Sequence, residues 1–494
     1  MTFGTTIDEA VAPLILALDV GSTGTRGGLY DARGLPVKGA RLKVPHAFTT
    51  AADGTSTIDA DQVADELRAC IDYCATRFEV PIAGVALDTF ASSLVGVDAD
   101  DQAITPAFTY ADSRCAPQVS YLRSTLDEDE TQQRTGTRQH PSYLPARFLW
   151  LKEHHADAFA RARRWVSIGE YAWLRLLGTT AAGTSTAAWT GMLNRHTCTW
   201  DEPLAAAVGV PVEKLSPIAH PSQPLTPAVD IARTWPTLAD AVWFAPVSDG
   251  HTQSLGAGAT DSSQLVLSAA TSGALRRIVT GAIDDLPRGL WCYRIDEDRS
   301  ILGGAINDVG RAMTWLEETL KLPEPEVLAE YLAAEPLPDL PLVLPWFTGE
   351  RSTGWIGDAR AVLSGVSAAT TPSELYRGTV EGVALSYQRM LTELLRVAGP
   401  PAEIIGTGRV SLEHPGLLQV IADVTGAPVT PVTIKRSTLH GTALHALDVL
   451  APGVARADVT RAETLAPRRE RAGYYRRQVE RFQILYDKVY APAR

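Results

Sequence analysis

The chain has 494 residues, of which 45% are hydrophobic and 21% charged, and its formal net charge is −12. This composition is that of a globular protein with ample core, and the length predicts two to three domains. An acidic chain without a basic stripe is a poor nucleic-acid binder and gains nothing at an anionic membrane, so we expect neither partner.

The cysteine pattern and the lack of a long apolar run predict a cytoplasmic protein. The five cysteines are scattered and form no CxxC, which excludes a disulfide framework or a zinc site as an interpretation and favours a reducing compartment. No apolar run reaches the roughly 20 residues of a membrane span. The N-terminal stretch lacks a basic region, so it does not read as a signal peptide. The sequence leaves open whether the chain forms a homodimer.

The first predicted elements repeat one pattern. Residues 15–37 contain an apolar strand that ends at Asp19, a turn at 21–25, and a second strand at 27–30. An amphipathic helix is expected to begin near Asp59. Residues 82–105 then repeat the opening order, with an apolar strand that ends in polar residues, a second strand and a turn.

Helices and strands continue to alternate through the rest of the chain. Residues 147–178 predict two helices with Gly178 as a C-terminal stop. Residues 241–250 predict a strand that runs into a glycine-rich helix start, and 264–279 predict two strands around the turn 271–273. A Pro/Gly-rich loop at 336–361 precedes a long helix capped by Thr371 or Ser373. Strand and helix patterns follow at 403–410, 414–426 and 438–450.

These elements predict an α/β architecture that is built twice. Each half opens with a hairpin whose turn is rich in glycine and hydroxyl groups, and the break between the halves falls near residues 255–262. We expect a ligand to be held between two similar lobes.

The first turn has the chemistry of an anion site. Gly21, Ser22 and Thr23 offer N–H and O–H donors at close range, and Arg26 adds a forked cation suited to phosphate. A plain hairpin turn is the alternative. Asp19 beside bound phosphate indicates a divalent cation between them, with Mg²⁺ as the usual choice in phosphoryl transfer. No lysine follows a glycine, which excludes a P-loop.

Asp249 is the second acid at the end of a strand. It is interpreted either as a helix cap or as a general base that accepts a proton from an attacking hydroxyl. It is also a candidate metal ligand. Asp19 and Asp249 are expected to face each other across a shared cleft, in an arrangement suited to phosphoryl transfer to an alcohol.

Seven segments in register now point to a family. They include "LDVGSTGTR", "SDGHTQSLGAGA", "AATSGALRRI" and "GERSTGWIGDARAVLSGV". This set resembles the FGGY family of carbohydrate kinases, within the sugar kinase/actin/heat-shock chaperone ATPase superfamily. The resemblance implies two ribonuclease H-like lobes with a central cleft. The N-terminal lobe would span 1–256 and bind sugar, and the C-terminal lobe would span 257–494 and bind nucleotide. ATP and Mg²⁺ are the implied cofactors.

The resemblance also assigns roles to residues. Asp249 is implied as the catalytic base and Asp19 as the Mg²⁺ ligand. The implied contacts to phosphate, ribose and adenine are Gly21, Ser22, Thr23, Arg26, Thr271, Ser272, Gly273, Gly304, Gly310 and Gly408. The substrate candidates are Ser92, Tyr110, Asp112, Arg114, His140, Ser142 and His251. Alternatives stay open, because Asp112 and Arg114 can pair with each other and His140 can be an ordinary loop histidine.

The substrate implied by the resemblance is a sugar or sugar acid. Several stretches lean towards gluconate kinases, such as "TGTRQHPSYLPARFLWLKE" and "GGAINDVGRAMTWL". A carboxylate on the substrate would need a cation, for which Arg114 or Arg138 is the candidate. Ser92, Tyr110 and Arg409 depart from the family pattern. Arg409 either rearranges the adenine pocket or weakens nucleotide affinity.

Three other functions compete with a gluconate-like kinase. A pentulose or polyol kinase of the same family is the nearest alternative, and a non-catalytic sugar-binding protein on the kinase scaffold is the second. An actin-like filament ATPase is disfavoured by the sugar-kinase segments "GERSTGW" and "SDGHTQ".

Overall fold

Two mixed sheets organise the computed structural model, which describes residues 3–490. The strands of the first sheet, in spatial order, are β14 (Pro224–Leu225), β15 (Val242–Phe244), β6 (Gly84–Thr89), β1 (Ile15–Gly21), β2 (Gly24–Tyr30) and β3 (Pro36–Val44), with β16 (Val247–Ser248) also paired to β6. Those of the second are β19 (Trp291–Arg294), β20 (Arg299–Ile306), β18 (Gly273–Thr280), β17 (Gln264–Ala269), β23 (Glu403–Thr407) and β24 (Val429–Pro431).

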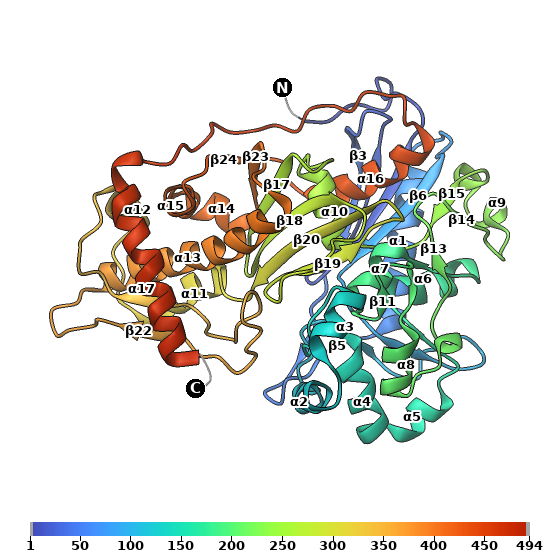
Figure 1. Cartoon of the computed structure of the whole chain (residues 1–494). Helices are drawn as coiled ribbons and strands as arrows, with labels where there is room; N and C mark the ends of the chain where they lie inside the picture. The colour runs from blue at the N-terminus through green and yellow to red at the C-terminus, as the bar shows by residue number, and fades with distance from the viewer. Residues whose placement is uncertain (1–2, 491–494) are drawn as a thin grey trace.

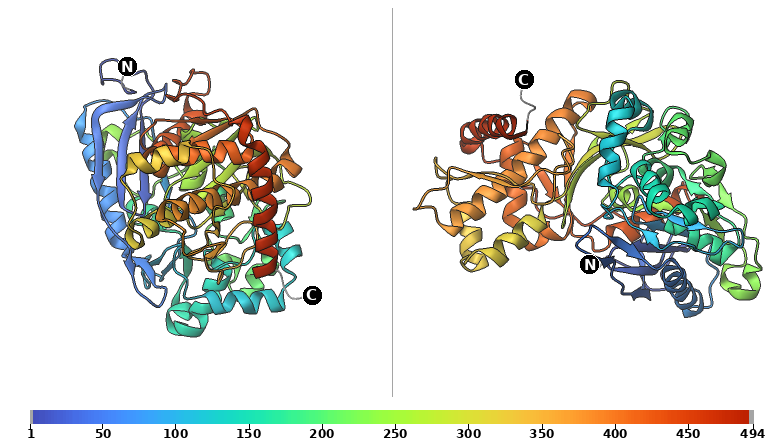
Figure 2. Two further views of the ribbon diagram at one scale, coloured as in Figure 1. Left: turned by 90° about the vertical axis from the view of Figure 1, so that its left-hand side faces the viewer. Right: turned by 90° about the horizontal axis from the view of Figure 1, so that it is seen from below.

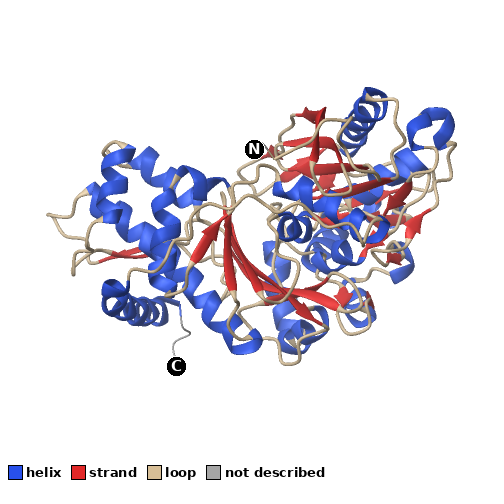
Figure 3. Ribbon diagram, turned by 90° about the horizontal axis from the view of Figure 1, so that it is seen from above, coloured by secondary structure: helices blue, strands red, loops and turns tan. Residues whose placement is uncertain are grey.

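The two sheets share one topology. In each, an antiparallel hairpin, β1–β2 or β17–β18, has a third antiparallel strand on one side. On the other side, a parallel strand pairs with the first strand of the hairpin: β6 pairs with β1, and β23 with β17. The predicted α/β architecture is therefore present twice, and Figures 2 and 3 show the two lobes side by side.

Helices from distant parts of the chain cover the two faces of the first sheet. Leu16, Leu18 and Val20 of β1 pack against α1 (Ala60–Arg77) and α6 (Ile168–Leu177), while Ile15 and Ala17 face the opposite side. That side is covered by α16 (Ser437–Leu450), which lies among the strands of the N-terminal lobe although it follows the second sheet in sequence (Figure 1). This helix is an exception to the boundary drawn between 256 and 257.

α16 also crosses α10 (Asp249–Gly256) at close range. A Cβ built on Gly441 would lie 1.8 Å from the carbonyl oxygen of Thr252, and one on Gly256 would lie 1.7 Å from that of Ser437. The two backbones therefore touch, and only glycine leaves room for this crossing.

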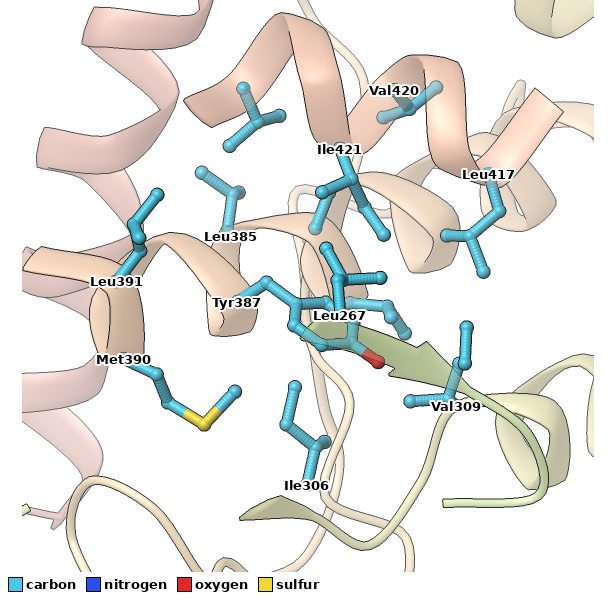
Figure 4. Packing of buried hydrophobic residues seen from close by; sticks show 14 of the residues in the cluster. Leu267, Ile306, Val309, Leu385, Tyr387, Met390, Leu391, Leu417, Val420 and Ile421 are labelled. Carbon is cyan, nitrogen blue, oxygen red and sulfur yellow. The ribbon is translucent and has the colours of Figure 1, made fainter. Parts of the chain in front are cut away.

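The core of the second lobe forms between its sheet and a layer of helices. Leu267, Val309, Tyr387 and Leu417 are fully buried there, and the Tyr387 hydroxyl donates to the carbonyl of Ser268 at 2.7 Å (Figure 4). The helices of this lobe are α11 (Gly310–Thr319), α12 (Pro325–Ala333), α13 (Pro372–Ala398), α14 (Arg409–Glu413), α15 (Pro415–Thr425) and α17 (Ala472–Tyr490).

Two of the predicted helix ends lie at the residues expected. Thr371 caps α13 and forms a capping box with Glu374, and Gly178 ends α6 in the left-handed conformation. Three helices rather than the two expected lie over 147–178: α4 (Leu144–His154), α5 (Ala156–Arg161) and α6, with β9 (Arg164–Val166) between the last two. α17 was not predicted from the sequence.

An insertion after β6 builds the side of the N-terminal lobe that faces the second sheet. Its remaining helices are α2 (Ala116–Thr125), α3 (Glu128–Thr135), α4 (Leu144–His154), α7 (Thr184–Trp189) and α8 (Glu202–Val208). Trp189 of α7 stacks on Tyr293 of β19 with ring centroids 3.9 Å apart, and the hydroxyls of Tyr143 and Tyr293 lie 2.5 Å apart. These contacts join the insertion to the second lobe.

The other regular elements are short. They are β4 (Thr49–Thr50), β5 (Ser56–Ile58), β7 (Val95–Val97), β8 (Ala107–Phe108), β10 (Ala182–Gly183), β11 (Leu193–Asn194), β12 (Thr199–Trp200), β13 (Ile218–Ala219), β21 (Leu342–Leu344), β22 (Val362–Ser364) and α9 (Ile231–Thr234). All five cysteines are free thiols. Among the helices of residues 3–490, none combines the length and the apolar character that a membrane span requires.

Candidate active site

Three carboxylates meet at one edge of the first sheet. Asp19 of β1 is the register partner of Asp88 in β6, and Asp249 directly follows β16, which also pairs with β6. Asp19 and Asp88 are almost completely buried, with 2% and 0% of their surfaces exposed. Asp19 and Asp249, which were expected to face each other across a shared cleft, thus come from neighbouring strands at the same edge of the first sheet.

Asp88 is the member of this group that the sequence prediction missed. Burial raises its pKa well above the usual value, and the charge of Asp19 adds to the effect. The Thr442 hydroxyl of α16 donates to its Oδ2, whereas its Oδ1 is buried without a hydrogen-bond donor in the described part of the chain. The sequence carried a signal for it, since "VALDT" repeats the strand-then-acid order of "LALDVG".

Cations and burial oppose each other at Asp19. Burial raises the pKa of this carboxyl, whereas the nearby Arg26 and His46 lower it. Nη1 of Arg26 donates to Oδ2 of Asp19 at 2.6 Å. Arg26 thus lies at the turn between β1 and β2 with its charge directed at the acid.

Asp249 has the electrostatics of a base that works near neutral pH. Its pKa is raised to about 6, because burial raises it more than the neighbouring Arg276 of β18 lowers it, and the charge of Asp19 also raises it. Nη1 of Arg276 also donates to Oε1 of Gln253 at 2.7 Å. Arg276 was not predicted from the sequence, and it brings a cation of the second lobe to the carboxylates of the first.

The residues present fit a magnesium ion. Mg²⁺ in kinases takes one or two carboxylates and completes its shell with water and phosphate oxygens. Asp19 and Asp88 supply two adjacent carboxylates, and Oδ1 of Asp88 has no donor of its own. Within residues 3–490 no group of three or more acids, histidines or cysteines forms a complete metal cage, so the fit is to an ion shared with phosphate.

The first turn leaves Ser22 and Thr23 exposed between β1 and β2. A buried pair supports it from below: Nε2 of His46 lies 2.8 Å from the carbonyl oxygen of Gly21, and Nδ1 lies 2.7 Å from Oε2 of Glu66. Both partners offer oxygen atoms to the ring, so the imidazole bridges Glu66 and the backbone of the first turn. Neither residue belongs to a local pattern, and sequence reasoning missed them.

We expect His46→Leu to destabilise the fold and to weaken nucleotide binding. The change removes the ring that hydrogen-bonds to Glu66 and to Gly21, so the free energy of unfolding should fall by about 1–3 kcal/mol and the KM for MgATP should rise. Urea unfolding and steady-state kinetics test this, with the exposed His196→Leu as the control. Equal KM and stability in wild type and His46→Leu would show that the pair does not support the turn.

The second turn brings several predicted cofactor residues together. Thr271 and Ser272 are exposed between β17 and β18, and α11 begins beside them, where the Gly310 N–H donates to the carbonyl of Ala270 at 2.9 Å. Gly408 has a φ of +106°, and a Cβ there would lie 2.2 Å from the carbonyl oxygen of Ala269. Backbone N–H groups and hydroxyls are therefore concentrated at one end of this sheet, as a phosphate site requires.

Two of the predicted glycines are explained by packing. A Cβ on Gly273 would lie 2.0 Å from the Tyr387 hydroxyl, and a Cβ on Gly304 would meet Met390 and Ser352.

Arg409, which departs from the family pattern, turns outward: its side chain is 83% exposed and Nε pairs with Oε1 of Glu413 at 2.5 Å. Its guanidinium therefore does not fill the space beside Gly408.

Two of the substrate candidates, Tyr110 and His140, lie near a residue that was not predicted, Arg351, and a third, Ser142, contacts His140. Arg351 acts electrostatically on Tyr110 and on His140, whose pKa is held far below the usual value by burial and then by Arg351 and Arg123. His140 is therefore neutral, and its Nδ1 accepts from the Ser142 N–H at 3.1 Å. Tyr110 also lies close enough to Asp249 for that carboxylate to contribute to its raised pKa, after burial.

The other four substrate candidates are engaged elsewhere. Asp112 and Arg114 pair with each other at 2.6 Å, which is the alternative stated for them, and Arg114 also stacks over Trp150. The Ser92 hydroxyl donates to the carbonyl of Trp189 at 2.5 Å. His251 is buried on α10 against His445, with ring centroids 5.7 Å apart. Their contact with substrate stays a prediction that this packing does not favour.

Arg351 is a cation that has no carboxylate partner among residues 3–490. Its Nε is buried and has no hydrogen-bond partner, and no ion pair of Arg351 occurs within residues 3–490. The preceding Glu350 is already bound to Arg389 at 2.9 Å. Arg138, one of the two cations expected to meet a carboxylate, is bound to Glu128 and Asp129. Arg351 lies inside the segment "GERSTGW" that carries the family resemblance, but the sequence assigned it no role, so its role depends on the folded site.

Comparison with known proteins agrees with this geometry. The model of the FGGY family of carbohydrate kinases, N-terminal domain, matches residues 14–230, and the C-terminal domain model matches residues 284–447. A gluconokinase of Bacillus subtilis (strain 168) is 24% identical over 416 residues, which cover 80% of this chain and 79% of that protein. The xylulose kinase of Escherichia coli (strain K12) is 23% identical and covers 84% of this chain and 85% of its own.

A solved structure of similar shape carries a related name. The crystal structure of gluconate kinase from Lactobacillus acidophilus superposes with a TM-score of 0.89 at 25% identity and covers 97% of this chain and 98% of that one. With two lobes of one topology, acids at the strand ends and two glycine-hydroxyl turns, the chain belongs to the FGGY family of carbohydrate kinases and is a phosphotransferase that acts on a sugar hydroxyl.

Proposed function

We propose that this kinase uses MgATP to phosphorylate a hydroxyl of a sugar acid related to gluconate. The observation that supports an acidic substrate is Arg351, a cation near Tyr110 and His140 that has no carboxylate partner within residues 3–490. Gluconokinases among the relatives support the same substrate class. Arg351 is half-buried, a guanidinium that is partly removed from water without an anion is unfavourable, and a bidentate carboxylate suits its geometry.

The proton transfer is assigned to Asp249. Its pKa of about 6 leaves it ionised at neutral pH yet basic enough to accept a proton from the attacking hydroxyl. Arg276 beside it would keep the carboxylate oriented and limit the rise of its pKa. The accepted proton would stay on Asp249 until product leaves.

The phosphate groups are assigned to the two turns. Ser22, Thr23 and Arg26 would donate to them from the first lobe, and Thr271 and Ser272 from the second. Asp19 and Asp88 would hold Mg²⁺, which when bound offsets the negative charge of the phosphates. Gly310 and Gly408 would let the backbone approach ribose and adenine.

The proposed site places two requirements on the substrate. A hydroxyl of the substrate must reach Asp249 while its carboxylate reaches Arg351. Tyr110, whose pKa is affected by the charges of both residues, would line the space between them. A neutral pentulose or polyol satisfies only the first requirement. The relatives that are xylulose kinases keep this alternative open.

A substrate panel combined with a variant of Arg351 tests the proposal. We expect gluconate to give a higher kcat/KM than xylulose, ribulose, erythritol or glycerol in a coupled ADP-release assay. Arg351→Ala should lower kcat/KM for gluconate by about 10- to 10²-fold, the scale of one charged hydrogen bond, and leave slow neutral substrates unchanged. The exposed Arg360→Ala in the same loop is the matched control. A neutral sugar as best substrate, or equal losses for all sugars, would contradict the proposal.

A further inference from the structure

A cavity of about 240 Å³ lies between β2, β3 and the start of α16, beside the first turn rather than within it. It is lined by Arg26, Gly27, Arg41, Leu42, Lys43, Arg436 and Leu439. Four of these seven residues are cations and none is an acid, in a chain whose net charge is −12. This concentration of positive charge is local. Of the four cations, only Arg26 was assigned a role in the predicted site.

The sheet register explains why the cations converge. Arg26 of β2 is the cross-strand partner of Lys43, and Gly28 is the partner of Arg41, so Arg41 and Lys43 stand on the same face as Arg26. That face is the one covered by α16, whose Leu439 lies 3.5 Å from a Cβ built on Gly28.

Arg436 completes the cavity from the other side. It is the residue before α16 and has a φ of +66°, a left-handed conformation that is uncommon for arginine. Burial lowers its pKa, and the like charges of Arg41 and Arg26 lower it further. The first N–H groups of this 14-residue helix begin beside it and add the positive end of a helix dipole.

These charges are not balanced by the protein. Within residues 3–490, Arg41, Lys43 and Arg436 form no ion pair, and Arg26 has Asp19 alone. Arg41, Lys43 and Arg436 are exposed, so water screens part of their mutual repulsion, and an anion held between them removes the rest. A tetrahedral dianion meets several guanidinium forks at once, which a single carboxylate does not.

We infer that this cavity binds a phosphate group, from inorganic phosphate or a small phosphate monoester, and that an occupant draws Arg26 from Asp19 and slows the kinase. The slowing rests on the proposed role of Arg26 at the transferred phosphate, whereas the binding does not. Arg26 already spans both places, since it lines the cavity and donates to Asp19 at 2.6 Å. The cavity is too small and local for a nucleic-acid backbone.

Titration calorimetry with inorganic phosphate at constant ionic strength tests the binding. We expect saturable binding to the wild type and a dissociation constant at least about 10-fold higher in Arg41→Ala and in Arg436→Asn. Asparagine is chosen because it tolerates the left-handed conformation. Lys38→Ala, an exposed lysine of the same strand outside the cavity, is the control and should bind as the wild type does. Absence of binding, or equal binding in all variants, would overturn the inference.

The same titration separates this cavity from the nucleotide site. As a non-hydrolysable ATP analogue with Mg²⁺ is raised, the apparent dissociation constant for phosphate should rise to a plateau, because two coupled sites have a finite coupling energy. A rise without limit would mean direct competition and would assign the cavity to the nucleotide's own phosphates. This readout needs no turnover, so it stands even if the proposed sugar acid is not the substrate.

Kinetics then test the effect on the enzyme and identify the source of the phosphate. With the best substrate of the panel, phosphate should lower kcat several-fold in the wild type and have no such effect in Arg41→Ala. Comparing inorganic phosphate with the sugar phosphate product at equal concentration shows which form the cavity prefers. Inhibition that persists unchanged in Arg41→Ala and Arg436→Asn would show that it arises at the active site and would refute the regulatory part.

Discussion

Asp249→Asn is expected to lower kcat for sugar phosphorylation by about 10²- to 10⁴-fold, the range for loss of a positioned base. The asparagine keeps the shape of the side chain and removes its ability to accept a proton. MgATP binding should survive, because both turns and the Asp19–Asp88 pair remain in place. A coupled ADP-release assay measures kcat, and calorimetry with a non-hydrolysable analogue measures nucleotide binding.

The pH profile supplies an independent reading of the same residue. The pKa of Asp249 is raised to about 6, and the base must be ionised to act. Wild-type kcat/KM for the sugar should therefore fall as pH is lowered through about 6 and stay level above it. The residual activity of Asp249→Asn should lack this step. Full activity in the variant, or a step of the same size, would remove Asp249 as the base.

The same pKa predicts that Asp249 lowers stability at neutral pH. Its folded pKa lies above the ordinary value of 3.8, so the folded state binds the proton more tightly. The stabilisation from that proton is complete below about 4 and is lost as pH rises through about 6. We expect Asp249→Asn to be more stable than wild type at pH 8, by about 1–3 kcal/mol, and the difference to shrink at pH 4. Lower stability of the variant at pH 8 would contradict the raised pKa.

Gly441→Ala is expected to have the largest effect on stability. Its Cβ would lie 1.8 Å from the carbonyl oxygen of Thr252, where backbone meets backbone and no flexible side chain can yield. We expect the free energy of unfolding to fall by about 3 kcal/mol, the upper end of the usual cost of overpacking. Because Thr442 on the same helix donates to Asp88, kcat should fall as well.

Urea unfolding and the ADP-release assay measure both effects of Gly441→Ala. Gly453→Ala is the matched control, since a Cβ at Gly453 would have no atom within 4 Å. The control should be close to wild type in both assays. If Gly441→Ala were as stable as Gly453→Ala, the close crossing of α10 and α16 would not exist in solution.

The parts of the site that could be predicted from sequence are those with a local signature. A strand that ends in an acid before a glycine-hydroxyl turn is contained in about ten residues, and this pattern identified Asp19 and the first turn. The second turn was identified by its glycine and hydroxyl groups between two apolar strands. Asp249 was found in the same way, at a strand end before a glycine-rich helix. Asp88 also follows the pattern of a strand that ends in an acid, so the same pattern could have identified it.

The roles of other residues could not be assigned from local patterns. Arg276 and Arg351 lie in the segments "AATSGALRRI" and "GERSTGWIGDARAVLSGV", which pointed to the family without giving either arginine a role, and His46 lies in no such segment. Each of the three acts through a neighbour far away in the chain. His46 meets Gly21 and Glu66, and Arg276 meets Asp249 of the other lobe. Arg114 and Arg138 illustrate the reverse, because ion pairs within their own region had already engaged them.

The amino-acid sequence by itself determined the repeated α/β order, the two turns and two of the three strand-end acids, since strand alternation and turn chemistry depend on neighbouring residues. Tertiary structure decided that Asp19, Asp88 and Asp249 share one sheet edge, that α16 returns to cover the N-terminal sheet, and that Arg351 has no acid. These features depend on strand order, on which helix buries which apolar face, and on which charges the fold leaves unpaired. Such long-range choices are made by packing and burial over the whole chain, and no short segment contains them.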